Sequence, residues 1–151
     1  MALRFERHQT ILRPDGGSEV VLSIAPQTLA TQVFRHDPPT AFEVERAIDL
    51  VEDAIMETGL RLAERGELRL SEAELVAALG REPGPTRASR DEVEARFREL
   101  FSGQSRVREG ELEKPTGVIH EEGAASRNAA TLLIVRELLH HLGFEGVRGV
   151  R

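Results

Sequence analysis

The chain has 151 residues, of which 40% are hydrophobic and 30% charged, and its formal net charge at pH 7 is −6. This length suits one globular domain with a buried core, and the acidic balance argues against a broad nucleic-acid surface. Cysteine is absent, which excludes disulfides, thiolate nucleophiles and cysteine-ligated zinc. No apolar run approaches the roughly 20 residues of a membrane span, and no signal-peptide core follows Met1, so we expect a cytoplasmic protein.

Residues 3–24 predict an antiparallel β-hairpin. Apolar and polar residues alternate over 3–6 and again over 20–24, and Pro14-Asp15-Gly16-Gly17 provides a turn between the two runs. The next segment, 27–35, suits either a short helix or a third strand. The prolines that follow Asp37 then favour extended backbone.

Three Ser/Thr-x-x-Glu capping boxes place helix N-termini in the middle of the chain. In this motif the hydroxyl accepts from the backbone N–H three residues on, and the glutamate accepts from the N–H of the cap. The boxes are Thr40–Glu43, Ser71–Glu74 and Ser89–Glu92, and each opens an apolar-periodic segment. We therefore expect helices over 41–56, 72–79 and 90–101, the first ending there or continuing through Leu62. Between them we expect a short extended link at 68–70 and a loop at 81–85.

The last predicted helix, 128–142, differs from the others. Residues 129–135 are apolar except for Thr131, which leaves almost no polar face in its first half. A helix that is apolar all round is buried all round, so it is either the central core element or packs one face on a second subunit. Gly143 followed by Phe144 fits a left-handed helix cap with an apolar contact.

These elements together predict a single α+β domain over residues 1–151. An N-terminal antiparallel hairpin, with 27–35 as the candidate third strand, packs on about four helices, and the C-terminal helix is central. The polar stretch 104–124 is predicted as a loop with one β-like piece at 117–119. A loop of this length in a compact domain is usually functional or mobile.

The end of that loop is the candidate ligand site. Its possible acid–base residues are His120, Glu121 and Glu122, and its candidate ligand-binding residues are Ser126, Arg127 and Asn128. Free N–H groups and the dipole at a helix start favour an anion, and Arg127 adds a guanidinium. In the alternative interpretation Ser126 only caps the helix and the remaining residues are solvated, since no phosphate-loop or dinucleotide glycine pattern is present.

An acidic row on the first long helix is the candidate partner-binding site. Glu45, Asp49 and Glu52 are spaced i, i+4, i+7, and like charges four residues apart mildly destabilise a helix. The row therefore indicates arginines from elsewhere in the chain or from an arginine-rich protein partner. The simpler alternative is a solvated face of an acidic protein.

Metal and DNA binding have weaker support. The adjacent His140 and His141 point about 100° apart on a helix, and no His-Glu-x-x-His motif occurs, so we predict no metal and no cofactor. Residues 71–101 resemble a helix-turn-helix. However, the connection is too long, and acidic residues open the second helix where phosphates would lie.

We therefore predict a small, non-catalytic bacterial accessory protein that acts through protein contacts and self-associates as a homodimer. The bacterial origin is inferred from 19 arginines against one lysine, the bias of a GC-rich genome. The rival hypothesis is an enzyme or ligand-binding domain that uses 120–128 for a phosphate or carboxylate compound. The third is helix-turn-helix-like DNA binding through Arg81, Arg87, Arg90 and Arg98.

Overall fold

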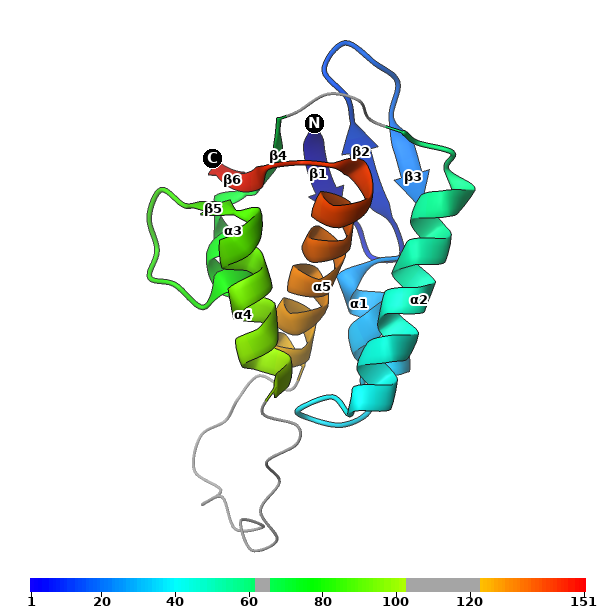
Figure 1. The fold of residues 1–151 in the computed structure, drawn as a ribbon, viewed down its shortest axis with the longest axis vertical. Coiled ribbons are helices and arrows are strands. Elements are labelled where there is room, and N and C mark those ends of the chain that lie inside the picture. The colour runs from blue at the N-terminus through cyan, green and yellow to red at the C-terminus, as the bar shows by residue number, and fades with distance from the viewer. Residues whose placement is uncertain (62–65, 103–122) are drawn as a thin grey trace, which may run out of the picture.

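The computed structural model describes residues 1–61, 66–102 and 123–151. Six strands form one mixed sheet in the order β3-β2-β1-β4-β6-β5 (Figure 1). The strands are β1 (Ala2–Phe5), β2 (Thr10–Arg13), β3 (Val20–Leu22), β4 (Glu67–Ser71), β5 (Arg87–Ser89) and β6 (Gly146–Val150). The helices are α1 (Pro26–Thr28), continued by the π-helical η1 (Leu29–Val33), then α2 (Ala41–Glu57), α3 (Glu72–Leu79), α4 (Arg90–Ser102) and α5 (Ala124–Leu142). The predicted α+β class is confirmed.

The N-terminal hairpin is a three-stranded meander. β1 pairs antiparallel with β2, and β2 pairs antiparallel with β3. The turn at Pro14, closed by the Gly17 N–H to its carbonyl at 3.2 Å, therefore joins β2 to β3, and the prediction missed β2. The ambiguous segment 27–35 is helical up to Val33, in α1 and η1, so it is not the third strand.

The capping boxes place the three middle helices correctly. At the start of α2, the Glu43 N–H donates to the Thr40 hydroxyl at 3.2 Å, and the Thr40 N–H donates to the Glu43 carboxylate at 2.9 Å. Ser89 and Glu92 make the same reciprocal pair at the start of α4. At α3 only the hydroxyl half is present, with Ser71 accepting from the Glu74 N–H at 3.5 Å. α2 ends at Glu57 and does not continue through Leu62.

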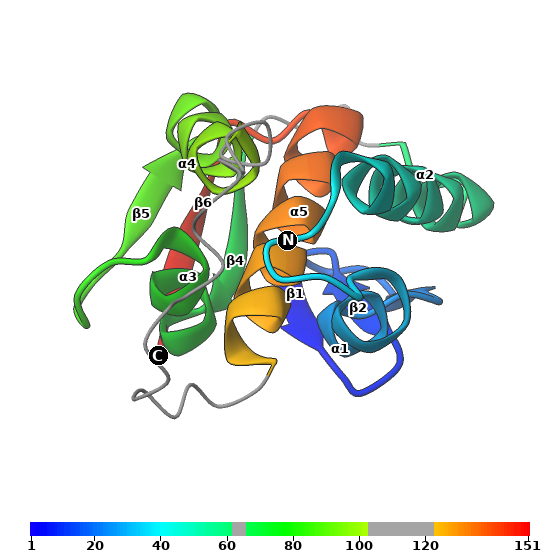
Figure 2. The same cartoon turned by 90° about the horizontal axis from the view of Figure 1, so that it is seen from below.

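The last helix is central, as predicted, and longer than predicted. α5 begins at Ala124, four residues before the expected start, because Gly123 rather than Ser126 is its N-cap. It lies between α4 and α2 in both Figures 1 and 2, and it also contacts α3 and α1. Eleven of its residues are buried, including every leucine. The chain itself covers this apolar helix, so the helix gives no reason to require a second subunit. None of the described helices is both long and apolar enough to cross a membrane.

Besides β2, the strands β5 and β6 were not predicted, because their residues carry little strand pattern. β6 pairs parallel with β4 and antiparallel with the three-residue β5, although it contains two glycines. One of these glycines is required by close packing: a Cβ on Gly146 would lie 2.6 Å from the carbonyl oxygen of Ala88 on β5.

We expect Gly146→Ala to lower the free energy of unfolding by about 1–3 kcal/mol, the usual cost of overpacking. The added methyl group meets backbone, which can relieve the clash only by moving β5 away from β6. Urea denaturation measures the loss. Gly66→Ala is the matched control, since nothing lies within 4 Å of a Cβ there, and its effect should stay within about 0.5 kcal/mol. Equal losses in the two variants would contradict the packing argument.

Candidate functional site

Three parallel strands end at one edge of the sheet. β1 pairs parallel with β4, and β4 with β6, so their last residues, Phe5, Ser71 and Val150, lie along the same side. We call this side the carboxyl edge. Open α/β sheets generally bind ligands in crevices outside the carboxyl ends of their parallel strands. Two cavities lined by described residues lie here.

The first cavity, about 320 Å³ in volume, brings two arginines together. Arg7 follows β1 and Arg127 lies in the first turns of α5, 120 positions later in the chain. The full lining is Phe5, Glu6, Arg7, Pro26, Gln27 and Arg127, and we call it the arginine cavity. Among the described residues, neither Arg7 nor Arg127 has a carboxylate within 4.0 Å, whereas Glu6 is engaged by Arg4 and Gln9. Two unpaired guanidiniums in one hollow suit an anion with several oxygens.

The start of α5 adds to this positive potential. Its N-cap is Gly123, which has no side chain to accept from the first backbone N–H groups. The first intrahelical bond runs from the Arg127 N–H to the Gly123 carbonyl at 2.9 Å. A helix of 19 residues carries a partial positive charge at this end, which favours negative groups nearby. The interpretation of Ser126 as the helix cap is therefore wrong, because it lies inside the first turn.

A carboxyl group with altered acidity lies near Arg127. Burial raises the pKa of Glu74 on α3, and the charge of Arg127 only partly opposes this shift. Glu74 thus keeps its proton to a higher pH than an ordinary glutamate. Glu74 does not line the arginine cavity, and its link to that cavity is the charge of Arg127.

The predicted ligand residues are only partly brought together. Arg127 lines the arginine cavity, whereas Ser126 and Asn128 lie in the same turns of α5 without lining it. His120, Glu121 and Glu122 lie outside the described residues. Arg7 was missed, since it stands in a charged turn that carries no recognisable motif.

The second cavity at the carboxyl edge is apolar, with a volume of about 510 Å³. It lies between the first turns of α3, the loop at Pro83 and Gly84, and the end of β6 at Val150. Its lining offers few groups that could bind a charged compound. The arginine cavity is therefore the better candidate for an anionic ligand.

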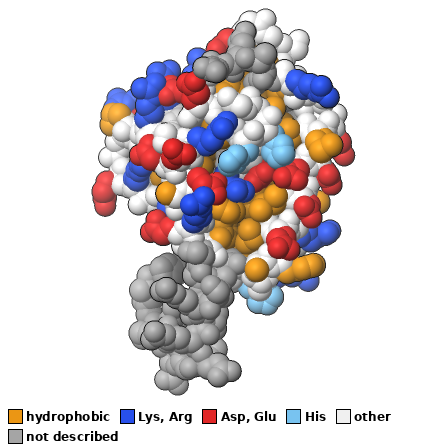
Figure 3. Space-filling model, viewed as in Figure 1, with side chains coloured by type: hydrophobic (Ala, Val, Ile, Leu, Met, Phe, Trp, Pro, Cys, Tyr) orange, Lys and Arg blue, Asp and Glu red, His pale blue; other side chains and the backbone are white. Residues whose placement is uncertain are grey.

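The predicted partner-binding row is divided by the fold. Glu45 and Asp49 are exposed, and neither has an ion-pair partner within 4.0 Å in the described part of the chain. Glu52 instead contacts His141 of α5, with 3.2 Å between its Oε1 and the imidazole Nε2. Figure 3 shows acidic and histidine side chains gathered on this face, above an apolar patch. Binding of an arginine-rich partner by this row stays a prediction.

The arginines considered for DNA binding are already engaged within the chain. Arg81 pairs with Glu92, Arg87 with Glu67, and Arg98 with Glu94. Arg90 donates to the carbonyl of Leu139 at 2.9 Å. Carboxylates thus lie beside three of the four guanidiniums that would have to face phosphates.

Comparison with solved structures finds the fold in phosphatases. A Ppx/GppA enzyme of Aquifex aeolicus superposes with a TM-score of 0.67 at 14% identity, over 98% of this chain and 52% of the enzyme. The type II variant of the Aquifex aeolicus Ppx/GppA phosphatase gives a TM-score of 0.67 over 99% of this chain. An exopolyphosphatase-like protein gives 0.64 over 92% of this chain and 48% of its own length, again at 14% identity. A scan against protein-family models and a search of curated proteins gave no match.

These likenesses show the fold, and the chain spans about half the length of the structures it matches. They contradict the prediction of a non-catalytic accessory protein, because the neighbours are enzymes and enzyme-like proteins of one phosphatase group. The sequence led to the wrong function because its main evidence was the apolar last helix. The chain's own sheet and helices bury that helix.

Proposed function

We propose that this chain is a phosphate-binding domain of a phosphatase-type enzyme, and that the arginine cavity holds a phosphate group of the substrate. One observation carries the proposal: Arg7 and Arg127, without carboxylate partners among the described residues, meet at the carboxyl edge. The phosphatase fold of the structural neighbours supports the same ligand class. Because those proteins are about twice as long, the proposal for this chain is limited to binding and orienting the phosphate.

In this proposal the arginine cavity binds the non-bridging oxygens of the phosphate group. Two guanidinium groups donate charge-assisted hydrogen bonds, each worth roughly 1.5–3 kcal/mol when well formed. The positive end of α5 adds attraction without a further side chain. Positive groups placed around a phosphoryl centre stabilise the charge that develops on its oxygens during transfer.

The test is calorimetric titration of the purified chain with inorganic tripolyphosphate. We expect Arg7→Ala and Arg127→Ala each to weaken binding about tenfold or more. Both side chains are exposed, and solvent reduces the strength of their hydrogen bonds to the ligand. Affinity should also fall as salt is raised, since exposed charges are screened. Arg46→Ala, which removes an exposed arginine on α2, is the matched control. Absence of binding by the unaltered chain, or equal weakening by all three variants, would contradict the proposal.

The other expectations stand beside this proposal as predictions. A single domain, self-association and a cytoplasmic location follow from the sequence arguments alone. Light scattering of the purified chain would measure its self-association.

A further inference from the structure

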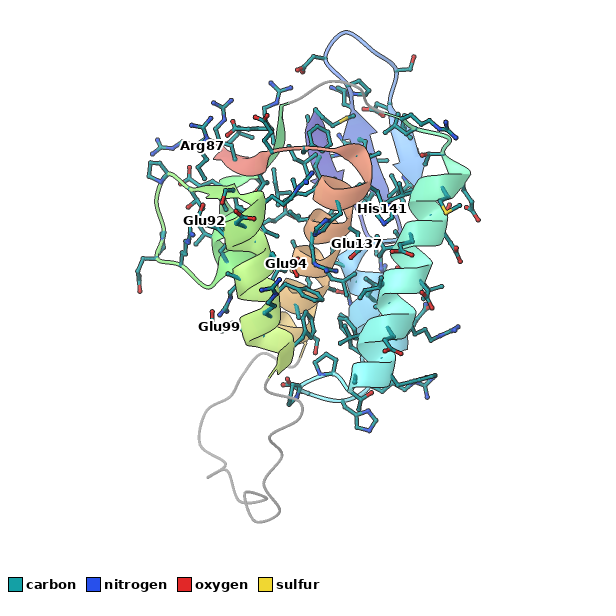
Figure 4. The ribbon with its side chains drawn as sticks, in the orientation of Figure 1. Arg87, Glu92, Glu94, Glu99, Glu137 and His141 are labelled. Atoms are coloured by element: carbon teal, nitrogen blue, oxygen red, sulfur yellow. The ribbon has the colours of Figure 1, made fainter. Side chains whose placement is uncertain are left out.

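A second polar cluster lies far from the carboxyl edge, near the other end of α5. Glu137 and His141 on α5, both labelled in Figure 4, lie against Glu52 of α2. His141 is 14 residues beyond Arg127, roughly 21 Å along the helix axis. The cluster is therefore separate from the arginine cavity, and nothing in the proposed phosphate binding uses it.

The three side chains already have the spacing of metal ligands. The Nε2 atom of His141 lies 3.2 Å from Glu52 Oε1 and 3.3 Å from Glu137 Oε2, and all three ligand atoms lie within 4.8 Å of one another. Zinc bonds of 2.0–2.2 Å to nitrogen and oxygen put tetrahedral ligand atoms about 3.3–3.5 Å apart. A metal ion could thus take the place of the shared imidazole proton with little movement of the ligands.

Contacts behind the cluster hold Glu137 in place. Its side chain is almost completely buried, and Arg136 Nη1 donates to Oε1 at 2.6 Å, which leaves Oε2 facing His141. Arg136 is fixed in turn by Glu94 of α4, whose Oε2 accepts from Nε at 2.6 Å. Outer contacts of this kind orient metal ligands and strengthen binding.

The cluster is also open to solvent on one side. The side chains of Glu52 and His141 are 39% and 36% exposed, so an ion can enter and a water molecule can complete its coordination. One imidazole with two carboxylates suits zinc and similar transition metals, whereas magnesium prefers six oxygen ligands in an octahedron. His140 is not part of the group, because its Nε2 faces Glu94 at 3.3 Å.

We propose that Glu52, Glu137 and His141 bind one divalent transition-metal ion of the zinc class, which joins α2 to α5. The sequence prediction of no metal considered the two adjacent histidines as joint ligands. The proposed site uses one of them, with a carboxylate four residues earlier and another from a different helix.

The experiment is calorimetric titration of the chelator-treated full chain with ZnCl₂, with MgCl₂ titrated in parallel. We expect one zinc ion per chain, and no magnesium binding at the same concentrations. His141→Asn and Glu52→Gln should each weaken zinc binding at least tenfold, because each removes a ligand. Zinc should also raise the melting temperature of the unaltered chain, because a ligand that binds the native state stabilises it against unfolding. It should not raise the melting temperature of His141→Asn, which lacks one of the ligands.

His140→Asn is the matched control, because it removes the neighbouring histidine and leaves all three ligands. It should keep the affinity of the unaltered chain. Far-UV circular dichroism checks that each variant is folded, and the two ligand variants change partly exposed side chains. Failure of the unaltered chain to bind zinc would overturn the proposal and leave the cluster as an ion-pair network only. Equal losses in His140→Asn and His141→Asn would overturn it too.

Discussion

Leu138→Ala is expected to lower the free energy of unfolding by about 3–5 kcal/mol, the cost of removing a fully buried leucine and leaving a cavity. Leu138 lies in the central helix α5 and has no exposed surface. Among the described residues, it belongs to the hydrophobic core cluster that joins α5 to the sheet and to the surrounding helices. At this chain length each kcal/mol shifts the melting temperature by roughly 2–4 °C, so a fall of about 10 °C should follow.

Guanidinium denaturation and calorimetry would measure both quantities. Met56→Ala is the control, because Met56 on α2 is 72% exposed and a change there should stay within about 0.5 kcal/mol. A loss at Leu138 no larger than the loss at Met56 would show that α5 is not buried as described.

Glu43→Ala is expected to lower the free energy of unfolding by about 2–4 kcal/mol, because Glu43 is a buried charged residue in the first turn of α2 whose hydrogen bonds would be lost. Its carboxylate accepts from the Arg35 N–H at 2.7 Å and from the Thr40 N–H at 2.9 Å, and it contacts His36 Nδ1 at 3.1 Å. Alanine would leave two partly buried backbone N–H groups unpaired and remove one half of the capping box. Glu45→Ala, two residues later and exposed, is the matched control and should change stability little.

The Glu43 carboxylate should also make the free energy of unfolding depend on pH. Burial acts to raise the pKa of Glu43, but the N–H groups of Thr40 and Arg35, together with His36, outweigh it and hold the pKa below the ordinary value of 4.5. A lowered pKa in the folded state means that the ionised group stabilises the fold above that ordinary value. The contribution is lost as the pH falls below about 4.5 and through the folded-state pKa. The stability difference between the unaltered chain and Glu43→Gln should therefore be full at pH 7 and shrink in acid. A difference that is constant with pH would contradict this account.

Local signals in the sequence were enough to predict most of the helices. Thr40 and Ser89 each form a reciprocal capping pair with the glutamate three residues on, and this contact needs nothing outside the segment. The apolar pattern of 129–135 likewise identified the central helix. The start of this helix was predicted at about Asn128, four residues late, because Gly123 caps it without a side chain and leaves no capping signal in the sequence.

The missing strands depend on contacts that are remote in the sequence. β6 contains Gly146 and Gly149 and has only one large, fully buried apolar side chain, Val147. It is a strand because β4 and β5 pair with it on both sides. No local pattern can report such pairing, since the partners lie 57 or more residues away.

The candidate sites were harder to predict than the fold for the same reason. Arg127 was identified from the helix start, but Arg7 becomes relevant only because the end of β1 and the start of α5 lie at the same edge. Glu137 and His141 were one helical turn apart in the sequence, yet the third side chain of their cluster comes from α2. Residue types and spacing along one helix cannot reveal a ligand from another helix.

The position of β6 in the sheet has a consequence for how the protein folds. This strand lies between β4 and β5, although residues 146–150 are the last of the described strands to leave the ribosome. Until they emerge, β4 has one open edge and β5 has no strand partner within the described chain. Because pairings between distant segments form slowly and open edges invite association, nascent chains halted before Gly146 should be bound by chaperones or aggregate.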